Sequence, residues 1–312
     1  MLNLFLGYHC NLDCPYCFAK GFAEEYPKPL STADFSRFLT WMKRHNLQSL
    51  GLLGGEPTLH PLFGDFLQEL YENGIDVALF TNALFAPALR EPISNYTANI
   101  VVNCNPFTSL TAAQQERWRS NMTALKDSGC RMTFSKNFAK DALDYTHVLS
   151  ACEEYGVTHV RYDITRPHSR RTNNYYDWPD SRSVVDALLS FTADCHALGI
   201  KTGLDCCLPL CHFTAGELQF MRQHSTKFNA VCFPSLDVHP DLSVSYCLPL
   251  KNICAHDVTA FAGELGLMEH FAKLVRPFRQ LSAHESCTRC DSFNRLCQGG
   301  CLALRQPVTQ AN

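Results

Sequence analysis

Three cysteines near the start of the chain have a spacing that suits an iron–sulfur cluster. They are Cys10, Cys14 and Cys17, in the run Cys-Asn-Leu-Asp-Cys-Pro-Tyr-Cys, and they follow a short apolar segment that predicts a strand. Three thiolates on one short loop can bind three irons of a four-iron, four-sulfur cubane and leave the fourth iron open to another ligand. The alternative is a structural zinc loop, which would lack its fourth ligand here.

The composition favours metal sites over disulfides. The chain of 312 residues has 17 cysteines and a formal net charge of -3, and its 27 lysines and arginines are scattered, which argues against nucleic acid as a partner. Neither a basic, apolar signal peptide nor a run of about 18 apolar residues occurs, so no membrane association is predicted. Thiols stay reduced in the cytoplasm and clustered cysteines there usually bind metal. We therefore expect a soluble, cytoplasmic protein.

The first two thirds of the chain predict a barrel-like α/β fold. Short apolar runs alternate with amphipathic stretches of helical period, which is typical of a parallel sheet covered by helices. Ser31 or Thr32 caps a helix over residues 33–45, and glycines mark four helix ends at positions 74, 129, 156 and 199. Six strand–helix units predict a partial (β/α)6 TIM-like barrel. The expected strands are residues 2–7, 50–53, 77–80, 100–103, 132–135 and 159–164, followed by 200–205.

The alternation stops near residue 206, where cysteines become frequent. We therefore predict two domains, a partial barrel over residues 1–205 and a small cysteine-rich extension over residues 206–312. Within the extension, residues 236–238 and 243–246 predict a β-hairpin. An apolar helical pattern predicts a helix over residues 257–275.

The cysteine triad, with an aromatic residue just before its last cysteine, resembles the defining motif of the radical S-adenosylmethionine superfamily. The run Gly54, Gly55, Glu56 and Pro57 follows the second strand and resembles the family's segment that hydrogen-bonds the methionine ammonium group. Its glycines permit close backbone approach, and its carboxylate suits a cation. Taken alone, the run would equally be a turn. The resemblance implies a four-iron, four-sulfur cluster and S-adenosylmethionine as cofactors.

Polar residues at later strand ends extend this resemblance. In relatives, residues at these places bind the ribose, and a basic residue pairs with the methionine carboxylate through a forked hydrogen bond. The alternative is that these polar side chains only form hydrogen bonds with the backbone of neighbouring loops, as residues at strand ends commonly do. The residues carried over on this resemblance are Asn82, Asn103, Ser135, Asn137 and the basic Arg161.

The cysteines of the extension resemble the SPASM and twitch extensions, which bind auxiliary iron–sulfur clusters in part of the superfamily. The pattern is Cys-x2-Cys-x6-Cys-x3-Cys after an upstream pair with Cys-x14-Cys spacing. In that family, the cysteine ligands of the two auxiliary clusters alternate along the sequence, so that the first cluster also takes the last of the four C-terminal cysteines. The resemblance therefore implies a first auxiliary cluster on Cys232, Cys247 and Cys301, with Cys211 as a plausible fourth ligand. A second cluster would begin with Cys287, Cys290 and Cys297.

The fourth ligand of that second cluster is a departure from the family, which has a further downstream cysteine where this chain runs to Asn312 without one. Cys254 or a carboxylate such as Asp291 could replace it, or one auxiliary cluster could form from a reshuffled set. The spacing from Cys290 to Cys297 is also one residue longer than usual, and Leu242 occupies a turn position where the family favours glycine. A zinc ribbon on the four last cysteines is the competing interpretation.

The resemblance implies an enzyme, a radical S-adenosylmethionine oxidoreductase or maturase. A low-potential donor such as flavodoxin or ferredoxin would reduce the cluster, and the 5′-deoxyadenosyl radical would take a hydrogen atom from substrate. Relatives with this extension most often modify ribosomally made peptides by oxidation, cross-linking or epimerisation, so a peptide is the leading predicted substrate. The chain starts almost at its first strand, without room for a leader-binding domain. That keeps a dehydrogenase or epimerase of a sugar or aminoglycoside-like molecule as the alternative.

Several further residues are candidates for the chemistry on substrate. A chamber-facing thiol could donate a hydrogen atom to a substrate radical, whereas a buried thiol is usually inert. Polar groups at the barrel mouth could contact substrate or transfer protons, or could form surface ion pairs. Hypotheses of another class are a non-catalytic iron–sulfur electron carrier and a zinc-stabilised interaction module. The candidate thiols are Cys104 and Cys207, with Cys206 similarly placed, and the polar candidates are Asp163, Asp205, Arg166 and His168.

Overall fold

The computed structural model describes residues 1–168, 171–177, 181–281 and 284–305. Its centre is one sheet with the strand order β10-β9-β8-β1-β2-β3-β4-β5-β6-β7. The first seven strands are parallel to their neighbours, as predicted. The strands are β1 (Leu2–Phe5), β2 (Ser49–Leu53), β3 (Asp76–Thr81), β4 (Asn99–Asn103), β5 (Met132–Phe138), β6 (His159–Ile164), β7 (Lys201–Leu204), β8 (Asp237–Val238), β9 (Val244–Ser245) and β10 (Cys254–Ala255).

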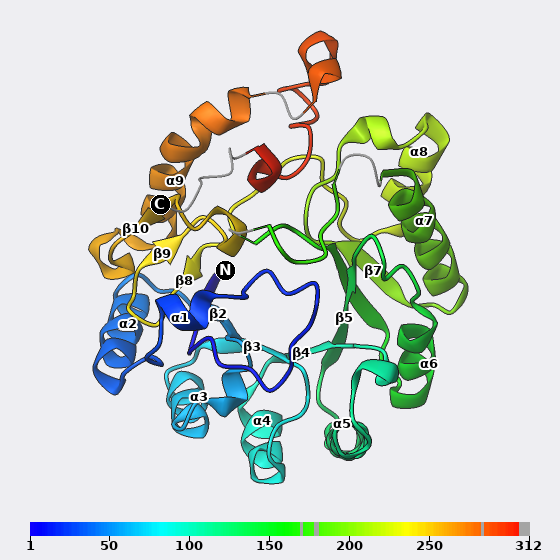
Figure 1. Cartoon of the computed structure of the whole chain (residues 1–312). Coiled ribbons are helices and arrows are strands. Elements are labelled where there is room, and N and C mark those ends of the chain that lie inside the picture. Colours follow the sequence, from blue (N-terminus) through cyan, green and yellow to red (C-terminus); the bar gives the residue numbers. More distant parts are fainter. Residues whose placement is uncertain (169–170, 178–180, 282–283, 306–312) are drawn as a thin grey trace.

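Helices cover the outer face of the curved sheet, which forms an open, partial barrel (Figure 1). This confirms the predicted α/β fold with a cysteine-rich C-terminal extension. No helix of the described residues has the length and apolar character needed to cross a lipid bilayer. The helices are α1 (Phe22–Glu25), α2 (Thr32–Arg44), α3 (Phe63–Glu72), α4 (Arg90–Tyr96), α5 (Ala112–Asp127), α6 (Thr146–Tyr155), α7 (Ser181–Ala197), α8 (Ala215–His224) and α9 (Gly263–Gln280).

Local signals in the sequence explain where these helices begin and end. The Ser31 side chain accepts a hydrogen bond from the backbone N–H of Asp34 at 3.0 Å, which caps α2. The glycines after α3, α5, α6 and α7 all have φ between 70° and 72°, a conformation that glycine adopts without a steric penalty. The apolar face of α2 buries Phe35, Phe38 and Met42 in the core. These helices therefore hold the strand ends in place by ordinary packing.

The C-terminal hairpin is part of the same sheet. β8 pairs with β1 in parallel and with β9 in antiparallel fashion, which confirms the predicted hairpin. In its turn, Leu242 has φ 66° where the related family favours glycine. Its side chain is fully buried, and this burial offsets a left-handed backbone that costs about 1 kcal/mol or more. The predicted boundary near residue 206 stays a prediction, although this strand pairing ties the extension to the barrel.

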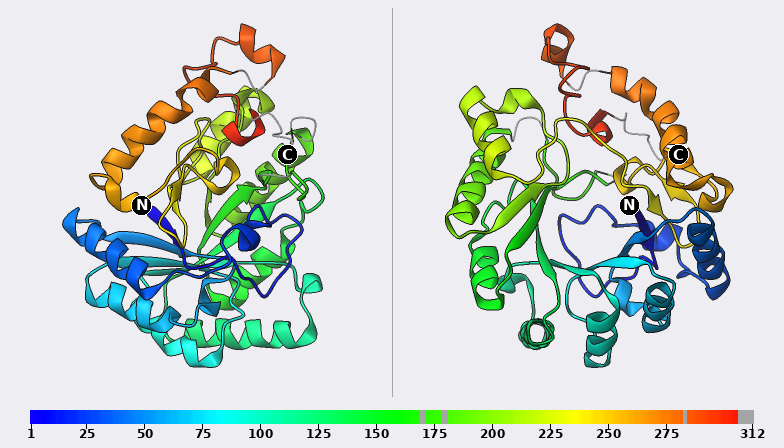
Figure 2. Two further views of the ribbon diagram at one scale, coloured as in Figure 1. Left: turned by 60° about the vertical axis from the view of Figure 1, so that its left-hand side comes forward. Right: turned by 180° about the vertical axis from the view of Figure 1, so that it is seen from behind.

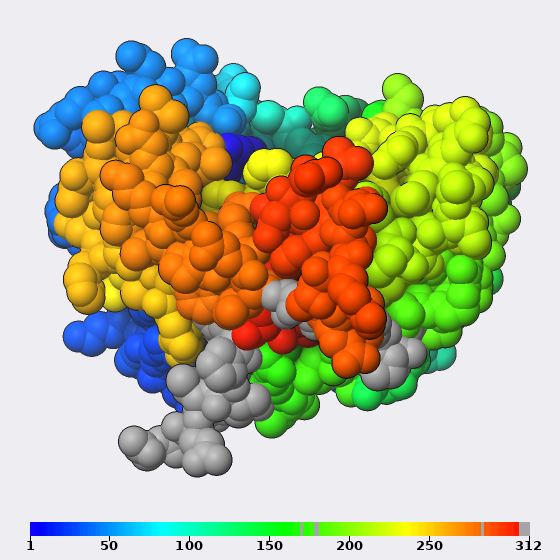
Figure 3. Space-filling model, turned by 90° about the horizontal axis from the view of Figure 1, so that it is seen from above, coloured from blue at the N-terminus to red at the C-terminus, as the bar shows by residue number. Residues whose placement is uncertain are grey.

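The predicted helix over residues 257–275 was wrong at its start. Asp257 instead caps a short 3-10 turn over Val258–Ala260, and its side chain accepts from the backbone N–H of Thr259 at 2.8 Å. The α-helix begins only at Gly263, which has φ 73°. From above, residues 284–305 lie between α9 and the pair α7 and α8 (Figure 3), and the side views agree (Figure 2). The last cysteines are thereby brought next to the end of β7.

Candidate functional site

The loop that carries the cysteine triad leaves β1 and crosses the open end of the barrel (Figure 1). Tyr16 anchors it, because its hydroxyl accepts from Asn103 Nδ2 at 2.8 Å and donates to Asn105 Oδ1. Asn137 Nδ2 in turn donates to Asn103 Oδ1 at 3.0 Å. Asn103 and Asn137 thus hold the loop over the ends of β4 and β5. Sequence analysis did not predict Tyr16 and Asn105 as anchors of the loop. The sequence indicated them only by their positions, Tyr16 next to a predicted ligand and Asn105 near a predicted strand end.

The triad thiols lie close enough together to affect one another's ionisation. Burial, with smaller contributions from the charges of Glu56, Cys14 and Cys17, raises the pKa of Cys10 to about 11. The backbone N–H of Leu12 donates to Cys10 Sγ at 3.4 Å, and amide groups of two asparagines approach the sulfurs at about 4 Å, Asn82 at Cys10 and Asn105 at Cys14. N–H groups aimed at sulfur are a means of tuning iron–sulfur clusters. This donor set fits a cubane with one open iron, whose binding would displace the thiol protons.

Gly54 and Gly55 allow the end of β2 to press against the start of the triad loop. A Cβ atom at Gly55 would lie 2.4 Å from the carbonyl oxygens of both Tyr8 and His9, and one at Gly54 would lie 2.8 Å from that of Gly7. The backbone N–H of Gly55 donates to Gly7 O at 2.9 Å. The glycines therefore permit close approach of two backbone segments within the protein.

The Glu56 carboxylate is buried and ties β2 to the end of β3. It accepts hydrogen bonds from the Thr58 hydroxyl at 2.7 Å, the Thr81 hydroxyl at 2.9 Å and the backbone N–H of Asn82 at 2.8 Å. Pro57 begins the short 3-10 turn that Glu56 caps. Burial raises the pKa of Glu56, and these donors lower it again in part. We therefore expect this segment to reach a ligand through its backbone more than through the Glu56 side chain.

Arg161 lies on the interior face of β6 beside Ser135 and Asp205. Its guanidinium donates to Asp205 Oδ2, and to the Ser135 hydroxyl at 3.2 Å, and it lies 5.2 Å from the centre of the Phe80 ring. Lys227 Nζ contacts the other Asp205 oxygen at 3.0 Å. Burial alone would raise the pKa of Asp205, but the two cations outweigh it and lower that pKa. Asp205 is thus an ion-pair partner of the residue predicted to bind the methionine carboxylate.

Asp163 follows Arg161 on the same face of β6 and accepts from the Cys206 thiol at 3.3 Å. Burial raises the pKa of Asp163, and Arg166 and Arg161 offset part of that effect. Arg166 is only 3% exposed and donates to the backbone oxygen of Cys207 at 2.9 Å. His168 is also buried, and its ring contacts the Thr172 hydroxyl at 2.7 Å within the loop after β6. The structure therefore directs Arg166 toward the cysteines of the extension.

Cys104 is not placed to face the barrel interior, which corrects the prediction that it could. Side chains alternate along a strand, so Asn103 points inward to Tyr16 and the next residue points toward the helices. Cys104 belongs to the hydrophobic core and is 5% exposed. Burial, with a smaller contribution from the charge of Cys152 of α6, raises its pKa to about 12. These are the properties of an inert structural thiol.

The cysteines of the extension form two groups. In the first cysteine group, Cys207, Cys232, Cys247 and Cys301, the Cys207 thiol donates to Cys232, which raises the pKa of Cys207 and lowers that of Cys232. Burial raises the pKa of Cys247, and the charges of Cys232 and Cys301 add to it. Cys207, predicted as a chamber thiol, therefore lies beside the predicted ligands Cys232 and Cys301 of the first auxiliary cluster.

The second cysteine group comprises Cys211, Cys287, Cys290 and Cys297. Burial raises the pKa of Cys211, and the neighbouring charges of Cys297, Cys287 and Cys290 raise it further. Cys211 was predicted as a ligand of the first cluster, and the structure instead places it here. Cys254 and Asp291 were the predicted replacements for the fourth ligand of the second cluster. Cys254 is an exposed residue of β10, and its charge acts on the Tyr26 hydroxyl. Asp291 is also exposed.

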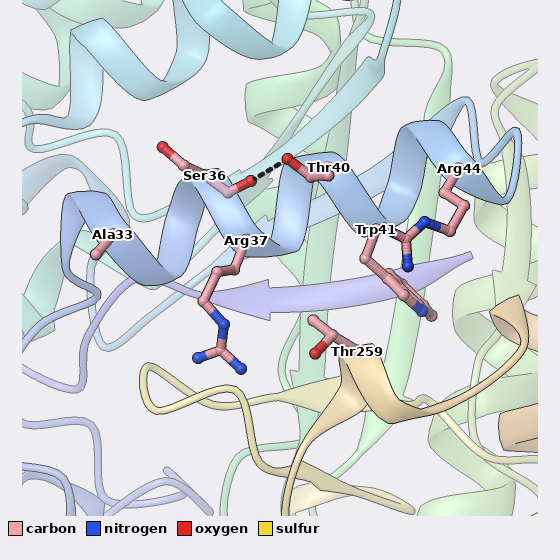
Figure 4. Close-up of a pocket in the computed structure, with 7 residues that line it drawn as sticks. All are labelled: Ala33, Ser36, Arg37, Thr40, Trp41, Arg44 and Thr259. Atoms are coloured by element: carbon pink, nitrogen blue, oxygen red, sulfur yellow. Dashed lines mark hydrogen bonds between the residues drawn. The ribbon is translucent and has the colours of Figure 1, made fainter.

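A separate hollow of about 350 Å³ lies on the outside of the barrel, between α2 and the turn Val258–Ala260 (Figure 4). Trp41 and Thr259 face each other across it, and Arg37 lies beside them. Arg37 is occupied by ion pairs with Asp34 and Asp257. None of the residues that line this hollow belongs to the predicted site.

Comparison with known proteins agrees with this geometry. Residues 4–106 match the Radical SAM superfamily. An S-adenosylmethionine-dependent nucleotide dehydratase of the Thermoplasmatales archaeon strain ISO4-H5 is 28% identical over 26% of this chain and 28% of its own. A 7-carboxy-7-deazaguanine synthase of Haemophilus influenzae is 27% identical over 50% of this chain and 68% of its own. The chain spans about a quarter to a half of the first curated relatives that it matches.

Solved structures show the same fold over nearly the whole chain. SuiB of Streptococcus suis with S-adenosylmethionine has a TM-score of 0.69 at 17% identity, covering 97% of this chain and 72% of that one. The enzyme anSMEcpe with AdoMet and a Kp18Cys peptide has a TM-score of 0.70 at 18% identity, covering 96% and 88%. The triad loop, the barrel and the cysteine-rich extension thus occur together: residues 4–106 match the Radical SAM superfamily, and nearly the whole chain has the fold of SuiB and anSMEcpe.

Proposed function

We propose that this chain is a radical S-adenosylmethionine enzyme that removes a hydrogen atom from a peptide substrate. The observation that carries the proposal is the set of three thiols on a loop anchored across the barrel mouth, beside a polar interior face. A cluster bound there supplies the electron that cleaves S-adenosylmethionine to a 5′-deoxyadenosyl radical. Cys10, Cys14 and Cys17 would hold it, and an electron donor of low potential such as flavodoxin or ferredoxin would serve it.

The residues of the barrel interior would bind and orient the cofactor. Arg161 offers a guanidinium to the methionine carboxylate, and the backbone of Gly54 and Gly55 lies next to the triad loop. Asn82 joins the loop to the end of β3, because its Nδ2 donates to Asn11 Oδ1 at 2.6 Å. The loop itself covers the mouth and would limit access of water to the reacting carbon.

A peptide is the proposed substrate because the similar structures that span the extension include peptide complexes. SuiB has been solved with its precursor peptide SuiA and anSMEcpe with peptides, and the chain matches both over 96% or more of its length. The second candidate is a small molecule. It is favoured by curated relatives named as a nucleotide dehydratase and a probable GTP 3',8-cyclase, which match 26% and 46% of this chain.

The test is formation of 5′-deoxyadenosine after anaerobic reconstitution with iron and sulfide and reduction with dithionite. The wild type is expected to make it, and a variant with Cys10→Ala, Cys14→Ala and Cys17→Ala is expected to make none. Wild-type protein that binds iron yet never cleaves S-adenosylmethionine would favour an electron carrier.

Substrate class is tested in the same assay with two sets of probes, the Kp18Cys and Cp18Cys peptides and nucleoside triphosphates such as GTP. A peptide substrate is expected to raise the rate of 5′-deoxyadenosine formation and to lose hydrogen, which mass spectrometry detects. Stimulation by a nucleotide without any change in the peptides would move the proposal to a small molecule.

A further inference from the structure

Two auxiliary sites need eight ligands, and the structure brings eight cysteines together in two groups of four. Only six of them are in the SPASM-like pattern of the extension. The other two, Cys207 and Cys211, come from the short segment directly after β7, in the run Cys-Leu-Pro-Leu-Cys. We propose that this segment supplies one ligand to each of two auxiliary four-iron clusters, Cys207 to the first cysteine group and Cys211 to the second.

Pro209 lies midway between Cys207 and Cys211 and packs closely against the loop that contains Gly300. A Cβ atom at Gly300, which has φ 88°, would lie 3.1 Å from Pro209 Cγ. Gly300 stands between Cys297 of the second group and Cys301 of the first. The two chain segments are therefore in contact at this point, and along each segment a cysteine of the first group lies on one side of the contact and a cysteine of the second group on the other.

The first group is held from several directions. The backbone N–H of Leu208 donates to Asn229 O at 3.2 Å, which fixes Cys207 beside the segment that leads to Cys232. The backbone N–H of Cys232 donates to Gln298 Oε1 at 3.1 Å, and the Tyr246 hydroxyl donates to Cys232 O at 3.1 Å. These hydrogen bonds thus fix Cys207, Cys232 and the last cysteine loop relative to one another.

Arg166 gives an independent sign of negative charge at the first group. It is 3% exposed, and its Nε atom is buried without a hydrogen-bond partner. A buried guanidinium needs compensation, and the Asp163 carboxylate near it supplies part of it. The charges of Cys206, Cys301 and Cys207 also act on Arg166. Four thiolates around a cluster would give this arginine the anionic neighbour that its burial requires.

The second group becomes complete with Cys211. Cys211 lies in the short 3-10 turn Leu210–His212, near enough to Cys287, Cys290 and Cys297 for their charges to act on its thiol. The backbone N–H of Gly299 already donates to Cys297 Sγ at 3.2 Å, as N–H groups do at cluster sulfurs. Cys211 would thereby be the fourth cysteine ligand of this group.

No three His, Cys, Asp or Glu side chains of the described residues are arranged around a single metal ion. A cubane is wider than one ion, so its cysteine ligands stand further apart than the four sulfurs that surround zinc at about 2.3 Å. With four thiolates each, neither cluster would keep an iron open for substrate. Both would then serve electron transfer or structure.

The experiment counts clusters in a background that lacks the radical site, with Cys10→Ala, Cys14→Ala and Cys17→Ala. Two auxiliary clusters predict about eight irons and eight sulfides per chain after reconstitution. Adding Cys211→Ala or Cys207→Ala is expected to halve the iron or to produce a three-iron signal in electron paramagnetic resonance. Cys254→Ala, which removes another exposed cysteine, is the matched control. It should leave the iron content and the resonance signal unchanged.

Cys211→Ser keeps the size of the side chain in case the alanine variant does not fold. It is expected to alter the resonance spectrum of one cluster and leave the other as it was. Iron content and spectra that are the same in the Cys211 and Cys254 variants would overturn the proposal, and so would zinc without sulfide. Because the background cannot cleave S-adenosylmethionine, the result is independent of the proposed function.

Discussion

The Tyr8 hydroxyl lies 2.5 Å from Nδ1 of His239, and this contact joins the root of the triad loop to the turn of the C-terminal hairpin. His239 is 1% exposed, stacks on the Tyr26 ring at 4.6 Å between centroids, and contacts the Ser245 hydroxyl through Nε2 at 3.1 Å. The extension and the radical site therefore share one packed aromatic cluster.

This contact predicts an acid-sensitive structure. Burial lowers the pKa of His239 to about 4 from an unfolded value near 6.5, so the unfolded chain binds more protons between these values. The contribution to stability is present above pH 6.5 and is lost as the pH falls toward 4, by about 3 kcal/mol in total. Thermal unfolding from pH 7 to 4.5 should show this slope in the wild type and a weaker one in His239→Gln. Parallel curves for the two proteins would contradict it.

Gly55→Ala should disrupt the triad loop. The new Cβ would meet backbone oxygens of Tyr8 and His9 at 2.4 Å, and backbone cannot move aside as a flexible side chain can. We expect a lower melting temperature and loss of the iron bound by the triad. Gly216→Ala is the control, because a Cβ there in α8 meets nothing within 4 Å and alanine should stabilise that helix by about 0.5–1 kcal/mol. Equal melting temperatures for the two variants would speak against a tight backbone contact.

Arg161 and Asp205 should have opposite effects on S-adenosylmethionine binding. Arg161→Ala removes the proposed partner of the methionine carboxylate, and a charge-assisted hydrogen bond of about 1.5–3 kcal/mol predicts binding weaker by roughly tenfold or more. Asp205→Asn frees the guanidinium and should strengthen binding severalfold. Isothermal titration with reconstituted protein measures both, with Lys227→Ala as a half-exposed control that also contacts Asp205. Unchanged affinity in Arg161→Ala would show that the carboxylate is bound elsewhere.

Cys104→Ala should leave the reaction outcome unchanged. The thiol packs against the helix layer, so its loss removes only a small buried group and is expected to cost about 1 kcal/mol of stability. Product analysis by mass spectrometry, with and without deuterated solvent, provides the check. Normal S-adenosylmethionine cleavage combined with a lost or altered product would restore Cys104 as a hydrogen-atom donor.

Short-range patterns explain what could be predicted from the sequence. The triad spacing, the cap at Ser31 and the glycine stops are local, because each depends on residues a few positions apart. The strands of the parallel sheet are buried apolar runs, so their places and order were predicted within one to three residues. The start of α9 was missed, since an apolar period cannot reveal that Asp257 first caps the start of a separate 3-10 turn.

Only the tertiary structure decided how the cysteines and charged residues are grouped. Cys207 and Cys211 are four positions apart, yet they lie in different groups, and no spacing rule contains the contact between Pro209 and Gly300 that lies between them. Arg161 and Asp205 were both recognised as strand-end polar residues, but their ion pair depends on the register of β6 against β7. The sequence by itself determined the chemistry that is available, a radical cluster motif and a supply of thiols. Packing between distant segments determined which thiols stand together.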